Sequence, residues 1–220
     1  MTNSVIPKFE MSFDDWIKFV FDHPVGDDIK SAWYWDDDLS EFWDQWEFEE
    51  GSAQRQERQL EYATRLFQDC SFLLAEYDPE QINQGFWFLL SGVSGFGLGD
   101  LIWKAQLPWS LREQCILSIV GTFQSIFLEI PEQDSCNMWW DLLRDFEENR
   151  DQRVTDAMFR ALQEILQSPA LACQVSALHG LGHIEHIDKH TVIEDYLRRS
   201  ENLDNETREY AIAAIKGEVL

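Results

Sequence analysis

The sequence has few cysteines, and none of them lie close together. Cys70, Cys115, Cys136 and Cys173 are separated from one another by at least 21 residues. A zinc knuckle or a thioredoxin-like motif needs two nearby thiols, so neither can form locally. The first ten residues also lack the basic and apolar regions of a signal peptide. We therefore predict a cytoplasmic protein whose cysteines are reduced and mostly buried.

Basic residues are scarce. The 220 residues include 17 Lys and Arg against 41 Asp and Glu, which gives a formal net charge of −24. The first fifty residues alone hold 14 acidic and 3 basic side chains. Such a field repels nucleic acid and anionic lipid and attracts basic proteins. We predict a basic protein partner, with no direct binding to nucleic acid or to a membrane.

Long apolar runs and strand patterns are both missing. Residues 81–99 carry no charge but include five glycines, and the uncharged run 114–128 is short. A membrane span needs about 20 apolar residues, so both runs indicate core helices. Alternation of apolar and polar residues, the mark of a half-buried strand, is not sustained. The sequence therefore predicts an all-α fold.

Apolar residues recur instead at helical spacing along most of the chain. Ser12 is placed to cap the first helix, and Asp78-Pro79 is a helix start with a capping residue before proline. The predicted helices cover 13–22, 52–77, 79 to the glycine-rich break at 92–99, 108–129, a short segment around 139–143, 151–167, 169–183, 190–199 and 205–218. We predict one continuous multi-helix domain. Residues 1–150 form its acidic, Trp-rich part, and residues 151–220 form a helical extension packed on it.

The last third contains an internal similarity. The segment from Ala177 to Ile184 and the segment from Ala211 to Ile215 place small residues at the same spacing, 34 residues apart. A helix of different phase, 192–197, lies between them. This pattern over 151–220 resembles HEAT-type helical repeats, which implies antiparallel helix pairs and most often a protein-binding scaffold.

Two short strings are similar to segments of uncharacterised bacterial proteins. They are Met-Trp-Trp-Asp-Leu-Leu at 138–143 and Ser-Ala-Leu-His-Gly-Leu-Gly-His at 176–183. The similarity implies no particular activity. Because a fold or a likeness does not settle function, the chemistry must come from individual residues.

Four of the five histidines fall within twelve residues, with Glu185 and Asp188 among them. They are His179, His183, His186 and His190. Imidazoles four residues apart share one helix face, an arrangement typical of divalent-metal sites. H-E-x-x-H is absent, however, and a predicted turn at 184–189 would scatter the ligands. The other interpretation is that these histidines satisfy the last carbonyls of a helix.

No pattern for cofactor binding or covalent catalysis is present. The glycine-rich segment 91–100 matches neither G-x-G-x-x-G nor the P-loop, and no G-x-S-x-G occurs. We predict no cofactor, no catalytic residue and no metal ligand. The alternative is a metal-dependent enzyme or sensor that uses the histidine cluster, which requires at least three converging imidazoles.

The N-terminal quarter combines aromatic with acidic residues and gives the leading hypothesis. Tryptophans are favoured anchors of protein interfaces, and complementary charge accelerates association. The predicted partner-binding residues are Trp33, Trp35, Asp36, Asp37, Asp38, Glu41, Asp44, Glu47, Glu49 and Glu50. These residues predict a non-enzymatic interaction module: an adaptor, an immunity-type protein or an inhibitor that mimics nucleic acid. The competing interpretation is that the tryptophans fill a core and the acids form its solvated face.

Overall fold

Helices make up nearly all of the regular structure of the chain. The computed structural model describes residues 11–26, 32–35, 53–92, 97–104, 106–144, 151–200 and 203–219. Their helices are α1 (Phe13–Phe21), η3 (Trp33–Trp35, a 3-10 turn), α3 (Ala53–Gln68), α4 (Leu73–Glu76), α5 (Pro79–Leu90), α6 (Leu98–Trp103), α7 (Trp109–Glu129), α8 (Asp134–Leu142), α9 (Gln152–Ile165), α10 (Leu171–His183), α11 (Lys189–Arg199) and α12 (Asn205–Lys216). These residues contain no strand. The predicted all-α single domain is confirmed.

Local capping residues begin several helices where the sequence predicts. The side chain of Ser12 accepts a hydrogen bond from the backbone N–H of Asp15 at 3.2 Å and starts α1. Asp78 precedes Pro79 at the start of α5, and Gln81 completes a capping box with the N-cap residue. Such caps satisfy backbone donors that the first helical turn leaves free, so they act without help from distant residues.

The predicted helix over 52–77 is wrong, because the chain breaks at 69–72 into α3 and α4. The backbone N–H of Asp69 turns to the carbonyl of Leu66 at 3.2 Å, and the hydroxyl of Ser71 donates to Asp69 at 3.1 Å. Polar side chains that bond locally in this way compete with helix propagation. The short helix α6 was also not predicted. It begins directly after Gly97, whose φ is 59°, at the end of the segment that the sequence marks as a glycine-rich break.

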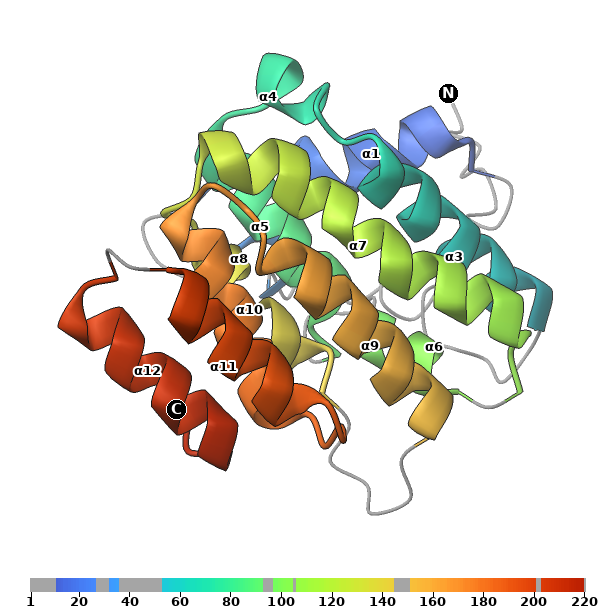
Figure 1. The fold of residues 1–220 in the computed structure, drawn as a ribbon. Coiled ribbons are helices and arrows are strands. Elements are labelled where there is room, and N and C mark those ends of the chain that lie inside the picture. The colour runs from blue at the N-terminus through green and yellow to red at the C-terminus, as the bar shows by residue number, and fades with distance from the viewer. Residues whose placement is uncertain are drawn as a thin grey trace, which may run out of the picture.

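Helix α7 lies between α3 and α9, and the three run side by side across the molecule (Figure 1). Aromatic side chains fill the space beneath them. Trp139 of α8 is fully buried, with its ring centroid 5.3 to 5.7 Å from those of four phenylalanines. These are Phe67, Phe86, Phe123 and Phe127. Large apolar rings of this kind carry much of the stabilisation from burial.

The C-terminal helices pack on this body through α10. It contacts α8, α9 and α12, while α11 contacts α12 at the outer edge of the molecule (Figure 1). The resemblance of 151–220 to HEAT-type repeats stays a prediction. Among the described residues, no helix combines the length and the apolar character needed to cross a membrane. The packing of α10 between α8 and α12 brings side chains of all three helices close to one another.

Candidate metal centre

Three side chains from two helices converge where α8 and α10 end. Asp141 lies in the last turn of α8, and His179 and His183 lie one turn apart on α10. Nε2 of His179 is 2.7 Å from Oδ2 of Asp141, and Nε2 of His183 is 3.0 Å from Oδ1 of the same carboxylate. The two Nε2 atoms are 3.0 Å apart. Two imidazole nitrogens and a carboxylate therefore share one small space.

This cluster is mostly shielded from water but not closed. The side chain of His179 is 9% exposed, that of His183 14% and that of Asp141 25%. Partial burial strengthens charge interactions relative to those at the surface. The carboxylate is the most exposed of the three side chains.

The outer nitrogens of the two rings face different partners. Nδ1 of His179 hydrogen-bonds to the hydroxyl of Tyr210 on α12. Nδ1 of His183 lies 3.2 Å from Nη1 of Arg144, which follows α8. Burial raises the pKa of Tyr210, and the charge of Asp141 adds to that shift, so the phenol stays neutral over the physiological range. The contact at Nδ1 therefore helps to fix the orientation of each ring.

With an ionised carboxylate, protons alone leave one of the three short contacts unfavourable. When both Nε2 atoms carry hydrogen, each donates to an oxygen of Asp141, but the two N–H groups then lie 3.0 Å apart. When His179 carries its hydrogen on Nδ1, its bare Nε2 faces the carboxylate at 2.7 Å. A hydrogen bond needs one donor and one acceptor, so a donor–donor or an acceptor–acceptor contact remains in each case. A cation placed among the two nitrogens and the carboxylate oxygens makes all three contacts favourable.

The backbone reinforces this preference for positive charge. The carboxyl end of a helix carries a partial negative charge, equivalent to about half an elementary charge. The cluster lies at the carboxyl ends of both α8 and α10, where Asp141 adds a full negative charge. An acidic residue in the last turn of a helix is unfavourable by itself, so its place here indicates compensation by a cationic group.

The spacing also fits a metal ion. In a tetrahedral site with ligands about 2.0–2.1 Å from the ion, ligand atoms are about 3.3 Å apart. Here Nε2 of His179 lies 2.7 Å from Oδ2 of Asp141, Nε2 of His183 lies 3.0 Å from Oδ1, and the two nitrogens are 3.0 Å apart. To reach the spacing of a metal site, the shortest contact lengthens by about 0.6 Å and the other two by about 0.3 Å. Asp141, His179 and His183 are therefore the residues that fit a divalent ion.

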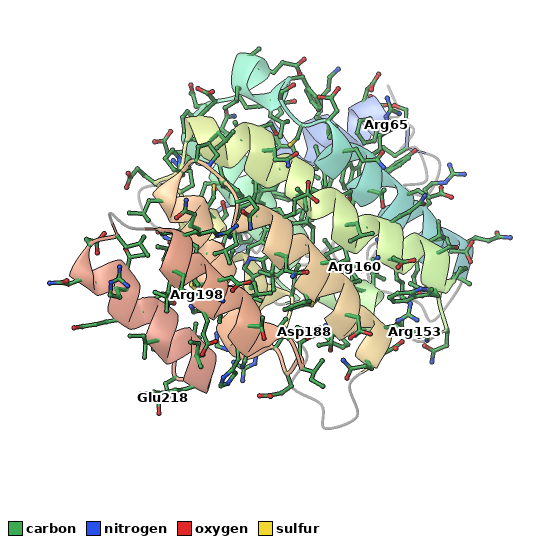
Figure 2. The ribbon with its side chains drawn as sticks, viewed as in Figure 1. Arg65, Arg153, Arg160, Asp188, Arg198 and Glu218 are labelled. Atoms are coloured by element: carbon green, nitrogen blue, oxygen red, sulfur yellow. The ribbon has the colours of Figure 1, made fainter. Side chains whose placement is uncertain are left out.

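The four predicted histidines do not converge. The ring of His186 stacks on Phe159 with centroids 3.7 Å apart, and its Nε2 lies 3.6 Å from a carboxylate oxygen of Asp156. His190 is exposed on α11. His186 lies in the turn between α10 and α11, which also holds Asp188 (Figure 2), and His190 lies beyond that turn. The requirement for three imidazoles is not met, and a carboxylate takes the place of the third.

The other interpretation, histidines bonded to helix carbonyls, does not describe His179. Both of its ring nitrogens face side chains. The cluster considered from the sequence comprised the four histidines with Glu185 and Asp188, and it did not include Asp141, which lies 38 residues before His179 in the sequence. One signal was present, however. Asp141 belongs to the string 138–143 and both histidines belong to the string 176–183, and the structure packs these two strings together on α8 and α10.

The predicted partner-binding residues divide into two groups. Trp33 of η3 is buried, stacked on His23 with centroids 3.8 Å apart and packed against Phe88 at 4.8 Å. This places it in the core, as the competing interpretation expected. The side chain of Trp35 and the residues Asp36, Asp37, Asp38, Glu41, Asp44, Glu47, Glu49 and Glu50 lie outside the described residues.

Comparison with protein-family models, with curated proteins and with solved structures gave no match for this chain. Its function is therefore inferred from the geometry of the cluster and from the distribution of charge along the chain.

Proposed function

We propose that this protein binds one divalent transition-metal ion through Asp141, His179 and His183. The observation that supports the proposal is the convergence of two imidazole nitrogens on the two oxygens of one carboxylate, with contacts of 2.7 to 3.0 Å. The outer contact of the His179 ring also suits a metal site, since ligating histidines are usually oriented by a second hydrogen bond. Tyr210 supplies that bond for His179.

The set of ligands narrows the choice of ion. Imidazole nitrogens favour zinc, iron, nickel and copper, whereas calcium and magnesium prefer oxygen ligands throughout. Three protein ligands leave at least one coordination position for water or a substrate, as in catalytic rather than structural zinc sites. A bound ion of this type supplies a Lewis acid and lowers the pKa of a coordinated water. The 25% exposure of the Asp141 side chain is compatible with an exchangeable ligand.

Metal titration tests this proposal directly. Protein freed of metal with a chelator is titrated with Co²⁺ or Zn²⁺ and followed by calorimetry and by the visible spectrum of Co²⁺. We expect one ion per chain, and a melting temperature that rises with metal concentration because the ion binds the folded state. Asp141→Asn and His183→Ala should each weaken binding at least about tenfold, since each removes a ligand.

The matched control is Asp134→Asn, which removes the same charge from the exposed first turn of α8. It should bind metal like the wild type. Equal affinity in Asp141→Asn, Asp134→Asn and the wild type would refute the site, as would the absence of any metal binding.

A second candidate function, capture of a basic protein by the acidic N-terminal quarter, is supported by the charge distribution. Fourteen of the 41 acidic residues fall in the first fifty positions, against three basic ones. Trp33 and Tyr34 are buried, so the chain immediately before Asp36 is anchored to the folded body. A concentration of negative charge on one segment favours rapid association with a basic surface.

Charge reversal tests the second candidate. The variant carries Asp→Lys at 36, 37, 38 and 44, and the control reverses four exposed acids elsewhere, Asp188, Glu194, Glu206 and Glu218. Both are used in a pull-down at low salt with elution by a salt gradient and mass spectrometry. We expect one basic protein to elute at a discrete salt concentration from the wild type and the control, and to be lost from the variant. Capture that survives in the variant would contradict the hypothesis.

A further inference from the structure

The two histidines of the proposed metal site differ in the residue that contacts Nδ1 of each ring. Nδ1 of His179 faces the hydroxyl of Tyr210, and Nδ1 of His183 faces a guanidinium nitrogen of Arg144 at 3.2 Å. A hydroxyl both donates and accepts hydrogen bonds, so it suits either tautomer of a ring. A guanidinium only donates, and it stays protonated in proteins. The partner of His183 therefore restricts its ring and the partner of His179 does not.

The tautomer that Arg144 imposes on His183 is incompatible with metal binding through Nε2. Because Arg144 donates to Nδ1 of His183, the hydrogen of the neutral ring lies on Nε2. Nε2 is the atom that faces Asp141 at 3.0 Å and His179 at 3.0 Å, and it would coordinate the ion. A ring that binds metal through Nε2 carries its hydrogen on Nδ1, where it points at another donor. The contact with Arg144 and a bond from Nε2 to metal exclude each other.

We infer that Arg144 and the metal ion exchange at His183: the guanidinium holds the ring in its metal-free tautomer, and it leaves when the ion binds. This inference rests on the proposed metal site. The positive charge of Arg144 also substitutes, in the metal-free state, for part of the charge that the ion brings to Asp141 and to the two helix ends. Arg144 thus regulates how readily the site fills.

The position of Arg144 allows such an exchange without movement of a helix. Its backbone N–H bonds to the carbonyl of Asp141 at 3.3 Å, so it lies on the turn that follows the ligand. The exchange requires its guanidinium to move away from the ring. The groups that face His183 include Asp141 from α8, His179 from its own helix and Arg144 itself.

Two substitutions test whether the side chain of Arg144 opposes metal binding at His183. Arg144→Met removes both the donor and the charge, whereas Arg144→Lys keeps both. The control is Arg160→Met, which removes one positive charge from the exposed side chain that pairs with Glu113 of α7 at 2.5 Å. Figure 2 shows Arg160 on α9. Each full-length protein is titrated with Co²⁺ and then challenged with Zn²⁺.

We expect Arg144→Met to bind Co²⁺ about tenfold more tightly than the wild type or more, the size usual for changes behind a metal ligand. Arg144→Lys and Arg160→Met should stay within about twofold of the wild type, which is less than half a kcal/mol. A second readout is the nitrogen NMR spectrum of the His183 ring. In the metal-free wild type the hydrogen should lie on Nε2, and in the Zn²⁺-bound protein it should lie on Nδ1.

The outcomes separate the two proposals. If wild type and Arg144→Met bind metal equally, or if Arg160→Met gains as much as Arg144→Met, the exchange is wrong and the metal site stands. If neither the wild type nor any variant binds metal, the site fails and the exchange fails with it. Tight binding in Arg144→Met with weak binding in the wild type supports both.

Discussion

The hydroxyl of Tyr210 on α12 hydrogen-bonds to Nδ1 of His179 on α10, across 31 residues of sequence. The bond joins the C-terminal helix to the cluster formed by α8 and α10. It also sets the direction in which the His179 ring presents Nε2 to Asp141, 2.7 Å away. The last helix of the chain is therefore part of the candidate site.

Tyr210→Phe should weaken metal binding. The change removes the hydroxyl that bonds to Nδ1 of His179 but keeps the aromatic ring at position 210. We therefore expect affinity for Zn²⁺ to fall about tenfold or more. The free energy of unfolding without metal should fall by about 0.5–1.5 kcal/mol for the lost hydrogen bond. Calorimetric titration measures the first quantity and denaturant unfolding the second.

The matched control is Tyr196→Phe on α11. Its hydroxyl donates to Gln174 at 2.8 Å, and none of the three ligand residues is involved. It should lower the free energy of unfolding by a similar amount and leave metal affinity unchanged. A loss of metal affinity as large as that of Tyr210→Phe would mean that the effect of Tyr210 is one of general stability.

Arg112 should matter more to stability than Arg153, although Arg153 makes the shorter bond to the same carboxylate. Both pair with Asp151, the N-cap of α9, at 3.3 and 2.8 Å respectively. The side chain of Arg112 is only 1% exposed and also donates to the carbonyl of Ile102, while that of Arg153 is 56% exposed and lies at the surface (Figure 2). Arg153 is nevertheless the main cause of the lowered pKa of Asp151.

We expect Arg112→Met to lower the free energy of unfolding by about 3 kcal/mol or more, because it leaves buried polar groups without a partner. Arg153→Met should cost about 1 kcal/mol or less, since solvent screens an exposed pair. Urea unfolding of the two variants at one pH measures both. The reverse order of the two losses would contradict the assignment of Arg112 as the stabilising partner of Asp151.

Gly121→Ala should destabilise the protein, against the usual preference for alanine in helices. A Cβ at Gly121 of α7 would lie 2.3 Å from the carbonyl oxygen of Phe67, at the end of α3. Alanine gains about 1 kcal/mol in helix propensity over glycine, but overpacking against backbone typically costs about 1–3 kcal/mol. We expect a net loss of up to about 2 kcal/mol by thermal or urea unfolding.

Gly92→Ala is the comparison for this effect. The nearest atom to a Cβ there is a carboxylate oxygen of Asp100 at 3.6 Å, an ordinary contact. Its free energy of unfolding should stay within about 1 kcal/mol of the wild type. If Gly121→Ala is as stable as Gly92→Ala, α3 and α7 do not approach as closely as the structure shows.

Stability should fall in alkaline solution as Tyr34 ionises. Burial raises the pKa of Tyr34 to about 12, whereas an exposed tyrosine has a pKa of about 10. Between these values the folded state holds its proton and the unfolded state releases it, so stability is complete below pH ~10 and declines above it. The loss should be on the order of 2 kcal/mol by pH ~12.

Urea unfolding between pH 8 and pH 11.5, with tyrosinate absorbance followed in parallel, measures the decline. Tyr34→Phe should make it shallower without removing it, because the pKa values of Tyr77, Tyr196 and Tyr210 are also raised by burial. A decline that is identical in Tyr34→Phe would show that Tyr34 ionises like an exposed residue.

The sequence by itself determined the helical class and the start of several helices. Helical periodicity, the cap at Ser12 and the pair Asp78-Pro79 act within one or two turns, so they are readable without the rest of the molecule. The same holds for His179 and His183, since a separation of four residues places two side chains on one helix face. Half of the candidate site was visible in this way.

Only the tertiary structure decided the remainder. The burial of Trp33 and the approach of Asp141 and Tyr210 to His179 depend on which helices pack together. Contacts across 31 and 38 residues leave no periodic signal, because the spacing between helices carries no information about which faces meet. The sequence determined which side chains each helix presents, and the packing of α8, α10 and α12 decided which of them form a site.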